Sequence, residues 1–440
     1  MLTPSELVAQ RLRPLLRGRV PGQVVIQCTD LCNARCPQCG MRVTERFECS
    51  RLPAEDIRAI LEQAARLGVS AVSFTGGEPF LLGDDLFALL DHAGRLGLDY
   101  LRTGTNGYMF MGSEKPDFLD RVKRLAARLA ETRLRNFWIS LDSADPAVHE
   151  AQRGLPGVVQ GIAKALPVFH SFGLFPTANL GLNRNVGGDW RLDPAQRPDR
   201  PLDEGAFRES FTASFQRFYR LAADLGFTIV NCCYPMSLEG DPGQAVYAAT
   251  SQDAVVRFSP REKTLLFRSL LEVIPAFRSR LRVFSPRSSL LALIRQHEAA
   301  ARGESGTHYP CRGGLDFFFI DSRDGQAYPC GYRGTESLGR FQDFDPARLP
   351  GRASCDRCDW ECFRDPSELF GPLLDLRAKV IPAQDQLLRR QTLFTGDRLD
   401  LIVKISRLHA GVAAELVDLV GGGLDQQHGA MGQRHVHGGA

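Results

Sequence analysis

Three cysteines lie close together near the start of the chain, in the segment QCTDLCNARCPQCGMR. Cys32, Cys36 and Cys39 fall within eight residues, directly after a short apolar run that predicts a strand. A [4Fe–4S] cluster takes four thiolate ligands, so three thiols on one compact loop leave one iron open to an outside ligand. Structural zinc is the alternative, but it would need a fourth ligand nearby. Cys28, four residues earlier on the strand, would have to bend round to supply it.

A second group of cysteines occupies the second half of the chain, in the segments YPCRGG, AYPCGYRG and CDRCDWEC. Its members are Cys311, Cys330, Cys355, Cys358 and Cys362. Two single cysteines followed by a CxxC pair can surround one tetrahedral centre. The residues alone leave two possibilities open, a zinc ribbon and an iron–sulfur cluster.

Short apolar, β-rich runs alternate with longer amphipathic stretches over the first half of the chain. The predicted strands cover residues 24–28, 71–75, 100–103, 137–141, 176–182 and 228–232. The predicted helices between them cover residues 53–67, 84–96, 117–132, 158–172 and 207–225. This alternation predicts an α/β fold whose parallel sheet curls into a partial barrel. In such sheets chemistry gathers at the carboxyl ends of the strands.

Glycines and polar residues follow the predicted strands at those ends. Gly76, Gly77 and Glu78 end the second strand, where paired glycines let backbone approach a ligand and the carboxylate could meet an ammonium group. A plain turn with a helix-capping acid is the alternative. His149 leads into the region after the fourth strand, where we expect it to face solvent or a helix cap. The other candidates are Thr105, Asn106, Ser140, Asp142, Arg153, Asn179 and Asn183.

The CxxxCxxC spacing straight after the first strand of this series resembles the signature of the radical S-adenosylmethionine (radical SAM) superfamily. The resemblance implies a partial (β/α)6 barrel of the TIM type and a [4Fe–4S] cluster on Cys32, Cys36 and Cys39. SAM would chelate the open iron and be cleaved reductively to a 5′-deoxyadenosyl radical, which removes a hydrogen atom from the substrate. One departure is Gln38, where many family members carry an aromatic residue near the adenine.

Later stretches resemble the SAM-binding motifs of the same superfamily in their order and spacing. The run TGGEP at 75–79 resembles a motif that binds the SAM amino group through its backbone, with Glu78 nearby. The run TNG at 105–107 resembles a turn that is common in the family. The resemblance also implies polar contacts to the ribose, carboxylate and adenine from Ser140, Asp142, Arg153, Asn179 and Asn183.

In this context the second cysteine group resembles the C-terminal SPASM or twitch extensions of the superfamily. There a first cysteine precedes a β-hairpin, predicted here at 315–320 and 326–328, and a second cysteine closes it. A full SPASM domain has seven cysteines, so the five present fit one auxiliary [4Fe–4S] cluster. The implied ligands are Cys311, Cys330, Cys355 and either Cys358 or Cys362.

Two adjacent cysteines end the last predicted strand, in the run TIVNCCYP. Either Cys232 or Cys233 could act catalytically by donating a hydrogen atom to a substrate radical, as thiols do in some radical SAM epimerases. A small apolar pair that finishes a strand is the alternative, and the residues alone favour it.

The formal net charge of the 440 residues is +3, which gives no reason to expect nucleic acid as a partner. We find no secretory signal and no apolar run long enough for a transmembrane segment, so the expected location is the cytoplasm. The resemblance implies a small-molecule or peptide substrate and a reducing partner such as flavodoxin or ferredoxin.

The segments predicted along the chain are a helical extension at 1–22, a barrel at 23–238, a helical linker at 239–305, a Cys-rich region at 306–366, C-terminal helices at 367–420 and a disordered tail at 421–440. Fewer than thirty residues precede the first strand, where peptide-modifying relatives often carry a leader-binding domain. We therefore expect oxidation, coupling or epimerisation of a small metabolite, a sugar or a lipid precursor. A peptide- or protein-modifying maturase and a non-catalytic iron–sulfur or zinc scaffold are the alternatives.

Overall fold

The computed structural model describes Leu15 and residues 18–34, 36–39, 49–234, 253–304, 309–345, Cys355 and 359–391, with backbone alone from 379 onward. Residues Met1–Arg377 belong to one compact unit and Ala378–Ala440 to a second. The sheet and the candidate site belong to the first unit. The tail predicted at 421–440 lies outside the described residues.

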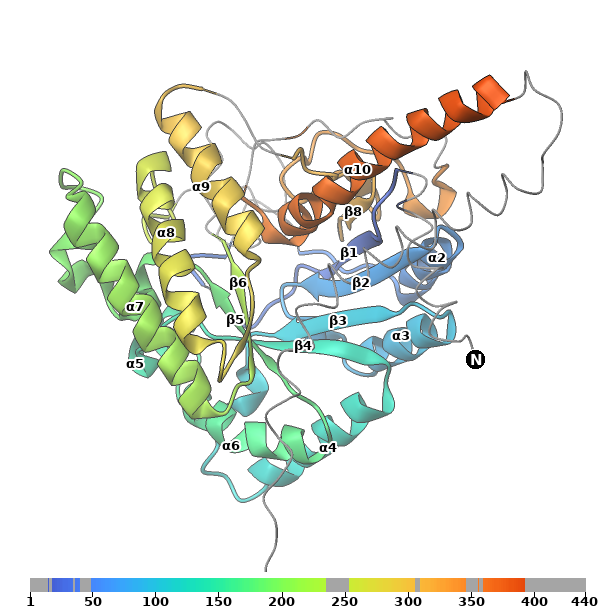
Figure 1. Ribbon diagram of the computed structural model, residues 1–440. Coiled ribbons are helices and arrows are strands. Elements are labelled where there is room, and N and C mark those ends of the chain that lie inside the picture. Colours follow the sequence, from blue (N-terminus) through green and yellow to red (C-terminus); the bar gives the residue numbers. More distant parts are fainter. Residues whose placement is uncertain are drawn as a thin grey trace, which may run out of the picture. The chain divides into compact units, whose positions relative to one another are not determined.

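The described strands form one sheet in the order β7-β6-β5-β4-β3-β2-β1-β8-β9, which curls into a partial barrel as predicted (Figure 1). Every neighbouring pair is parallel except β8 with β9. The strands are β1 (Gly22–Thr29), β2 (Val69–Gly76), β3 (Tyr100–Thr105), β4 (Leu134–Ser140), β5 (Thr177–Gly181), β6 (Ile229–Cys233), β7 (Arg282–Phe284), β8 (Phe317–Ile320) and β9 (Ala327–Tyr328).

Amphipathic helices cover the outer face of this sheet (Figure 1). In α2, for example, Ile57, Ile60, Leu61 and Ala64 recur at helical spacing and are all buried in the main core. The α-helices are α2 (Ala54–Arg66), α3 (Asp84–Arg95), α4 (Phe118–Glu131), α5 (Pro146–Arg153), α6 (Val158–Ser171), α7 (Glu204–Leu225), α8 (Pro260–Phe277), α9 (Arg287–Ala301) and α10 (Glu361–Gln391). Short 3-10 turns lie at Pro79–Leu82, Tyr108–Phe110, Arg184–Gly187, Trp190–Leu192, Pro194–Gln196 and Phe341–Asp343.

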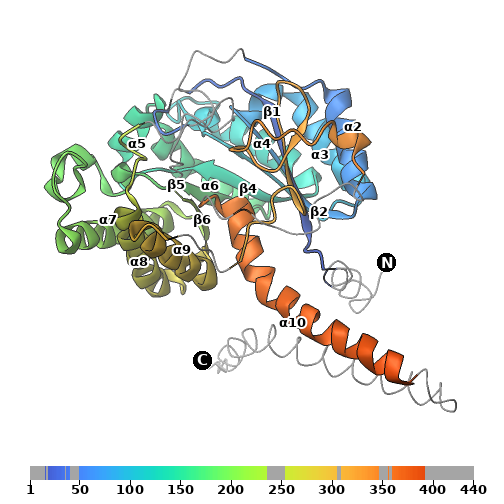
Figure 2. The ribbon, with the colours of Figure 1, turned by 90° about the horizontal axis from the view of Figure 1, so that it is seen from above.

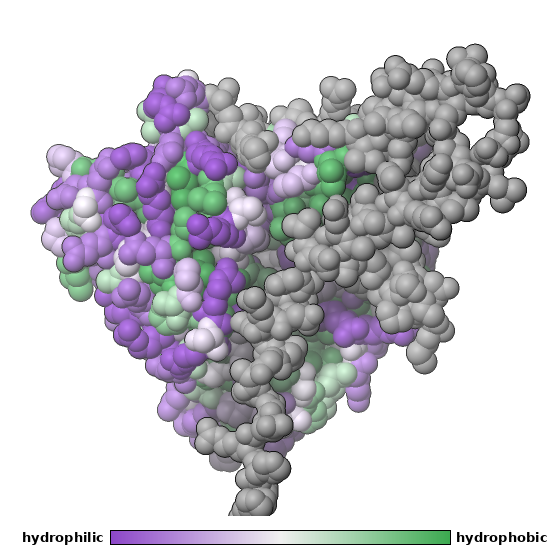
Figure 3. Space-filling view, viewed as in Figure 1, coloured by the Kyte–Doolittle hydropathy of each residue, from purple (hydrophilic) through white to green (hydrophobic). Residues whose placement is uncertain are grey.

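The surface over α7 to α9 carries mostly hydrophilic residues with hydrophobic ones between them (Figure 3). None of the helices in the described residues combines the length and the apolar character that a membrane crossing needs.

Strand alternation gives the sheet an apolar outer face and a more polar inner face. In β4, Phe137 and Ile139 are buried in the core under the helices, whereas Trp138 and Ser140 line the inside of the barrel. This two-residue period decides which strand residues can reach a ligand in the barrel.

The predicted hairpin of the Cys-rich region forms as β8 and β9, but it does not stand apart from the barrel. Val24 and Val25 of β1 pair in parallel with Phe318 and Phe319 of β8, which extends the barrel sheet past β1. Two further elements were missed. The helix α5 has only eight residues, and β7 lies inside a stretch predicted as helical, after α8 has ended at Phe277.

The first turns of α10 lie against the inner side of the barrel (Figures 1 and 2). The Arg102 guanidinium of β3 donates to the Cys362 thiol at 3.3 Å. The Tyr234 hydroxyl, directly after β6, donates to the Asp365 carboxylate at 3.3 Å. Residues from the end of the Cys-rich region are therefore brought into the space that the barrel strands surround.

A buried charge network ties α8 and α9 to the residues just before α10. The Asp359 carboxylate pairs with Lys263 of α8 and, at 2.8 Å, with His297 of α9. Although burial opposes it, His297 and Lys263 hold the pKa of Asp359 well below its usual value. Lys263 itself is only 3% exposed, so its charge is compensated inside the fold and not by water.

Replacing Lys263 with alanine should destabilise the fold, because the buried Asp359 carboxylate then loses its lysine partner. We expect the free energy of unfolding to fall by about 3–5 kcal/mol. Denaturant unfolding measures this, with Arg261→Ala as the matched control. Arg261 makes an exposed ion pair with Glu204, so its loss should cost at most about 1 kcal/mol. Equal losses in the two variants would contradict a structural role for the buried network.

Candidate active site

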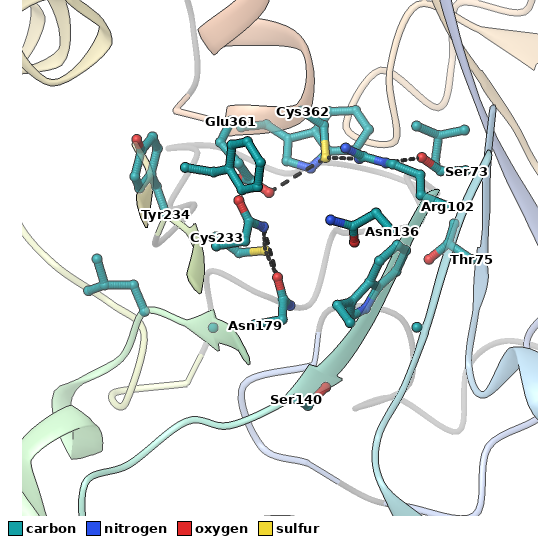
Figure 4. Close-up of a pocket in the computed structure, with 18 of the residues that line it drawn as sticks. Ser73, Thr75, Arg102, Asn136, Ser140, Asn179, Cys233, Tyr234, Glu361 and Cys362 are labelled. Atoms are coloured by element: carbon teal, nitrogen blue, oxygen red, sulfur yellow. Dashed lines mark hydrogen bonds between the residues drawn. The ribbon is translucent and has the colours of Figure 1, made fainter. Parts of the chain in front are cut away.

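The inner face of the partial barrel surrounds a cavity of about 1060 Å³. The cysteine loop after β1 and the strand ends from β2 to β5 line one part of it. Residues deeper on β3, β4 and β6 and the first turns of α10 line another part, which Figure 4 shows. A single space therefore adjoins most of the side chains that the sequence singled out.

The three clustered cysteines all line this cavity. One backbone N–H and one side-chain amide donate to the Cys32 sulfur: Ala34 N at 3.4 Å and Asn106 Nδ2 at 3.6 Å. Burial raises the pKa of the Cys36 thiol to about 12, while the Arg153 cation lowers it. Such donors stabilise thiolate ligands and tune clusters, so the loop fits a group that needs three sulfurs facing one space. Among the described residues, no three Cys, His, Asp or Glu side chains are grouped as ligands of a single metal ion.

Gly76 and Gly77 hold the start of the cysteine loop by close backbone contact. Gly77 N donates to Thr29 O and Glu78 N donates to Leu31 O, both at 2.8 Å. A Cβ on Gly76 would lie 2.3 Å from Thr29 O, and one on Gly77 would lie 2.2 Å from Leu31 O. Gly76 also has a φ of 150°, which disfavours other residues. The paired glycines are therefore required by the loop itself, whatever ligand they also approach.

Glu78 is completely buried, and its carboxylate holds the turn after β3. Its Oε2 accepts from Asn106 N at 2.7 Å and from Thr105 Oγ1 at 3.2 Å, and its Oε1 accepts from Phe80 N at 3.1 Å. Burial raises the pKa of Glu78 to about 7, although these hydrogen bonds lower it. Glu78 thus positions Thr105 and Asn106 at the cavity wall, a role that the sequence did not reveal.

Asp142 is a completely buried carboxylate that joins the cysteine loop to β4, β5 and α5. It accepts two hydrogen bonds from Arg153, at 2.6 and 3.0 Å, and one from Gln38 at 2.9 Å. Gly181 N donates to it at 3.3 Å. Gln38, noted in the sequence only as a departure from the family, therefore links the loop directly to this carboxylate.

Two neighbours of Asp142 differ from what the sequence suggested. His149 was expected near solvent or a cap, and this is wrong: it is fully buried, and its Nδ1 accepts from Asp142 N at 3.1 Å. Burial lowers the pKa of His149 to about 4, so the ring is neutral at pH 7. Asn183 does not line the cavity, because its amide donates to Asp142 O at 3.0 Å and to Gly181 O at 2.6 Å.

Cysteines of the second group separate in the structure. Cys311 N donates to Cys355 O at 2.7 Å, and Cys330 lies close enough to both that they help to raise its pKa. Burial raises the pKa of Cys311 to about 11 and that of Cys330 to about 12. Cys362 instead lines the cavity beside Arg102, and Cys358 lies outside the described residues.

Strand alternation also separates the last two predicted residues. Cys233 lines the cavity and its thiol donates to Asn179 Oδ1 at 3.4 Å. Cys232 is fully buried in the core on the opposite face of β6, so the structure does not place it where a substrate could react.

The remaining predicted cofactor contacts, Ser140 and Asn179, both line the cavity. Sequence reasoning missed Arg102, Asn136 and Glu361, which line its deeper part (Figure 4). The signal for Arg102 was present, since a charged residue stands inside the predicted strand at 100–103. Glu361 had no such signal, because it adjoins Cys362 in a run dominated by cysteines and acids.

Residues 26–180 match the family model described as Radical SAM superfamily. This stretch contains the cysteine loop and strands β2 to β4. The chain therefore contains a radical SAM domain, and such a domain implies a [4Fe–4S] cluster and SAM as cofactors.

Curated relatives are similar over part of the chain. The "Probable GTP 3′,8-cyclase" of Thermococcus kodakarensis is 30% identical over 169 residues, which are 38% of this chain and 50% of the relative. The "GTP 3′,8-cyclase 2" of Mycobacterium tuberculosis is 35% identical over 155 residues, 34% of this chain and 39% of the relative. The chain thus spans half or less of the length of these relatives.

Solved structures with similar folds include Streptococcus suis SuiB bound to S-adenosylmethionine, with 16% identity and a TM-score of 0.46 over 75% of this chain and 67% of that one. Native anSMEcpe with bound AdoMet has 16% identity and a TM-score of 0.44 over 73% of this chain and 78% of that one.

Adding a methyl group at Gly77 should displace the cysteine loop, because the Cβ would meet Leu31 O at 2.2 Å. We expect Gly77→Ala to fold but to bind less iron per chain after anaerobic reconstitution, by up to roughly the four irons of one cluster. Iron analysis and far-UV circular dichroism check the two parts. Gly205→Ala is the control, since a Cβ there meets nothing closer than 3.5 Å. Full iron content in Gly77→Ala would show that the loop does not depend on this contact.

Proposed function

We propose that this chain is a radical SAM enzyme that binds SAM beside a [4Fe–4S] cluster on Cys32, Cys36 and Cys39. It would remove a hydrogen atom from a substrate bound deeper in the same cavity. The observation that carries the proposal is the cavity itself, which joins the three thiols to polar side chains of β3 to β6 and of α10. A non-catalytic metal scaffold would need the cysteines but not this connected space.

The residues at the strand ends fit the two cofactors in distinct ways. The three cysteines would hold the cluster, and the backbone of Gly76 and Gly77 would face the SAM amino group. Ser140 and Asn179 line the adjoining wall. When bound and reduced by one electron, the cluster and SAM together supply a 5′-deoxyadenosyl radical. A low-potential donor such as flavodoxin or ferredoxin would supply that electron.

The chain's own residues hold this end of the cavity in place. Asp142 orients Arg153 beside the cysteine loop, and Glu78 orients Asn106 toward the Cys32 sulfur. Both carboxylates are completely buried, so water does not compete for these hydrogen bonds. Preorganised contacts of this kind keep a bound radical precursor at a fixed distance from its substrate.

The deeper part of the cavity suits a small polar substrate. Arg102, Asn136, Asn231 and Glu361 line it and offer both donors and acceptors. A volume of about 1060 Å³ is at the upper end of small-molecule sites, which accommodates a cofactor together with a small substrate. We therefore favour a metabolite, a sugar or a lipid precursor over a peptide.

The relatives named GTP 3′,8-cyclase do not extend this proposal to a nucleotide substrate. Their similarity covers 38% of this chain or less. That share is too short to include both the cysteine loop and the first turns of α10. The cavity wall that would contact a substrate is thus not matched as a whole.

An auxiliary [4Fe–4S] cluster on Cys311, Cys330 and Cys355 completes the proposed enzyme. Their grouping supports a shared centre, and the sequence offers Cys358 as the fourth ligand. With four thiolates the cluster would carry electrons and would not bind substrate.

Anaerobic reconstitution followed by addition of SAM and dithionite tests the proposal. We expect 5′-deoxyadenosine from the wild-type protein, and none from a Cys32→Ala/Cys36→Ala/Cys39→Ala variant. Mass spectrometry of the quenched reaction measures the product. Absence of 5′-deoxyadenosine from wild-type protein with its full iron content would overturn the enzyme assignment.

The same triple variant tests the auxiliary cluster separately. We expect it to retain roughly four irons per chain, the content of one [4Fe–4S] cluster. Metal analysis that finds zinc in place of iron would refute an auxiliary cluster and favour a zinc ribbon.

A further inference from the structure

Cys233 and Cys362, for which the sequence predicted different roles, face the same cavity. Cys362 was predicted as an alternative cluster ligand, and Cys233 as a thiol at a strand end. Both line the deeper part of the cavity, from α10 and β6 (Figure 4). Cys311 and Cys330 belong instead to the apolar cluster around Phe317 and Phe363.

The Cys362 side chain packs against that apolar cluster, but its sulfur has polar partners in the cavity. Arg102 Nη2 donates to the Cys362 sulfur at 3.3 Å, and the Cys362 thiol donates to Glu361 Oε1 at 3.5 Å. A thiol held by a guanidinium and a carboxyl group is already part of a hydrogen-bonded network.

Glu361 connects the two thiols. It is 7% exposed, and its carboxyl group interacts with Cys233 as well as with Cys362. Its second oxygen, Oε2, is buried at the cavity and has no hydrogen-bond partner among the described residues. On the far side of Cys233, the thiol donates to Asn179, which lies at the proposed SAM end. The two sulfurs thus lie along one wall that runs from that end into the deeper part.

Both thiols keep their protons at neutral pH. Burial and the nearby Glu361 raise the pKa of Cys362 to about 12, although Arg102 lowers it. Burial also raises the pKa of Cys233 well above its usual value. Hydrogen-atom donation requires an intact S–H bond, whereas nucleophilic chemistry requires the thiolate.

We propose that Cys362 and Cys233 form a catalytic thiol pair that returns a hydrogen atom to the substrate radical, and that Cys362 is not a ligand of the auxiliary cluster. This inference rests on the proposed function. Glu361 is a positioning residue, because it holds both thiols without reacting itself. The substrate is thereby restricted to one whose reaction leaves its oxidation state unchanged, as in inversion of a carbon centre.

Each turnover uses one thiol and then regenerates it. The S–H bond of one thiol breaks, a C–H bond forms on the substrate carbon, and the unpaired electron stays on sulfur. The resulting thiyl radical returns to the thiol by taking up one electron and one proton. The electron comes from the same class of low-potential one-electron donor that SAM cleavage requires, and the proton comes from water.

Deuterium labelling tests the thiol pair without knowledge of the substrate. In D₂O both thiols become S–D, and without substrate the 5′-deoxyadenosyl radical can take deuterium from a sulfur within reach, because S–H bonds are weaker than C–H bonds. Protein in thiol-free buffer with SAM and dithionite should therefore give 5′-deoxyadenosine that carries one deuterium. Backbone C–H hydrogens do not exchange with solvent, so they give unlabelled product.

Any 5′-deoxyadenosine that the Cys233→Ser/Cys362→Ser variant forms should lack the deuterium label. The exposed Cys49 provides the matched control, and Cys49→Ser should keep the label. Labelled product from the double variant, or unlabelled product from wild type, would overturn the thiol pair and leave SAM cleavage intact. If the wild-type protein forms no 5′-deoxyadenosine, that result counts against the proposed function instead.

Iron content tests the second half of the inference. Cys362→Ser should hold as much iron per chain as wild type, whereas Cys330→Ser should hold less. Loss of iron from Cys362→Ser with circular dichroism unchanged would show that Cys362 is a cluster ligand after all.

Discussion

Backbone contact between the cysteine loop and the turn after β2 is the constraint on which the rest of the site depends. Thr29 O and Leu31 O accept from Gly77 N and Glu78 N, and this close approach leaves no room for a Cβ at Gly76 or Gly77. The contact fixes the start of the loop just before Cys32. From the same turn, Glu78 reaches across to hold Asn106, whose amide donates to the Cys32 sulfur. These contacts join the carboxyl ends of β1, β2 and β3, and they hold the cysteine loop in its conformation.

The opposite wall of the cavity depends on a different connection, between the barrel and the Cys-rich region. β8 extends the sheet beside β1, and the first turns of α10 lie inside the barrel. Lys263 and His297 hold Asp359 in the segment that leads into α10. Glu361 and Cys362 follow Asp359 by two and three residues, so anchoring Asp359 brings them close to β3 and β6. The same region contributes a group of cysteines and part of the cavity wall.

Much of the barrel and of the SAM end follows from local patterns in the sequence. Apolar runs of strand length and helices that end at glycines predict β1 to β6 closely, and the cysteine loop occupies the carboxyl end of β1 as expected. The separation of Cys232 from Cys233 also follows from the two-residue period of a strand. The separation of Cys362 from Cys311 and Cys330 cannot be predicted from a local pattern, because it depends on how α10 packs against β3. His149 and Glu78 likewise depend on burial by distant residues.

A cluster on Cys32, Cys36 and Cys39 would present its one open iron to the cavity in which we propose that SAM binds. Electron paramagnetic resonance of the reduced, reconstituted protein, with and without SAM, tests this arrangement directly. SAM should shift the signal of one cluster, and that signal should be missing from a Cys32→Ala/Cys36→Ala/Cys39→Ala variant. A spectrum that SAM leaves unchanged in fully reconstituted protein would show that SAM does not bind an open iron of this cluster.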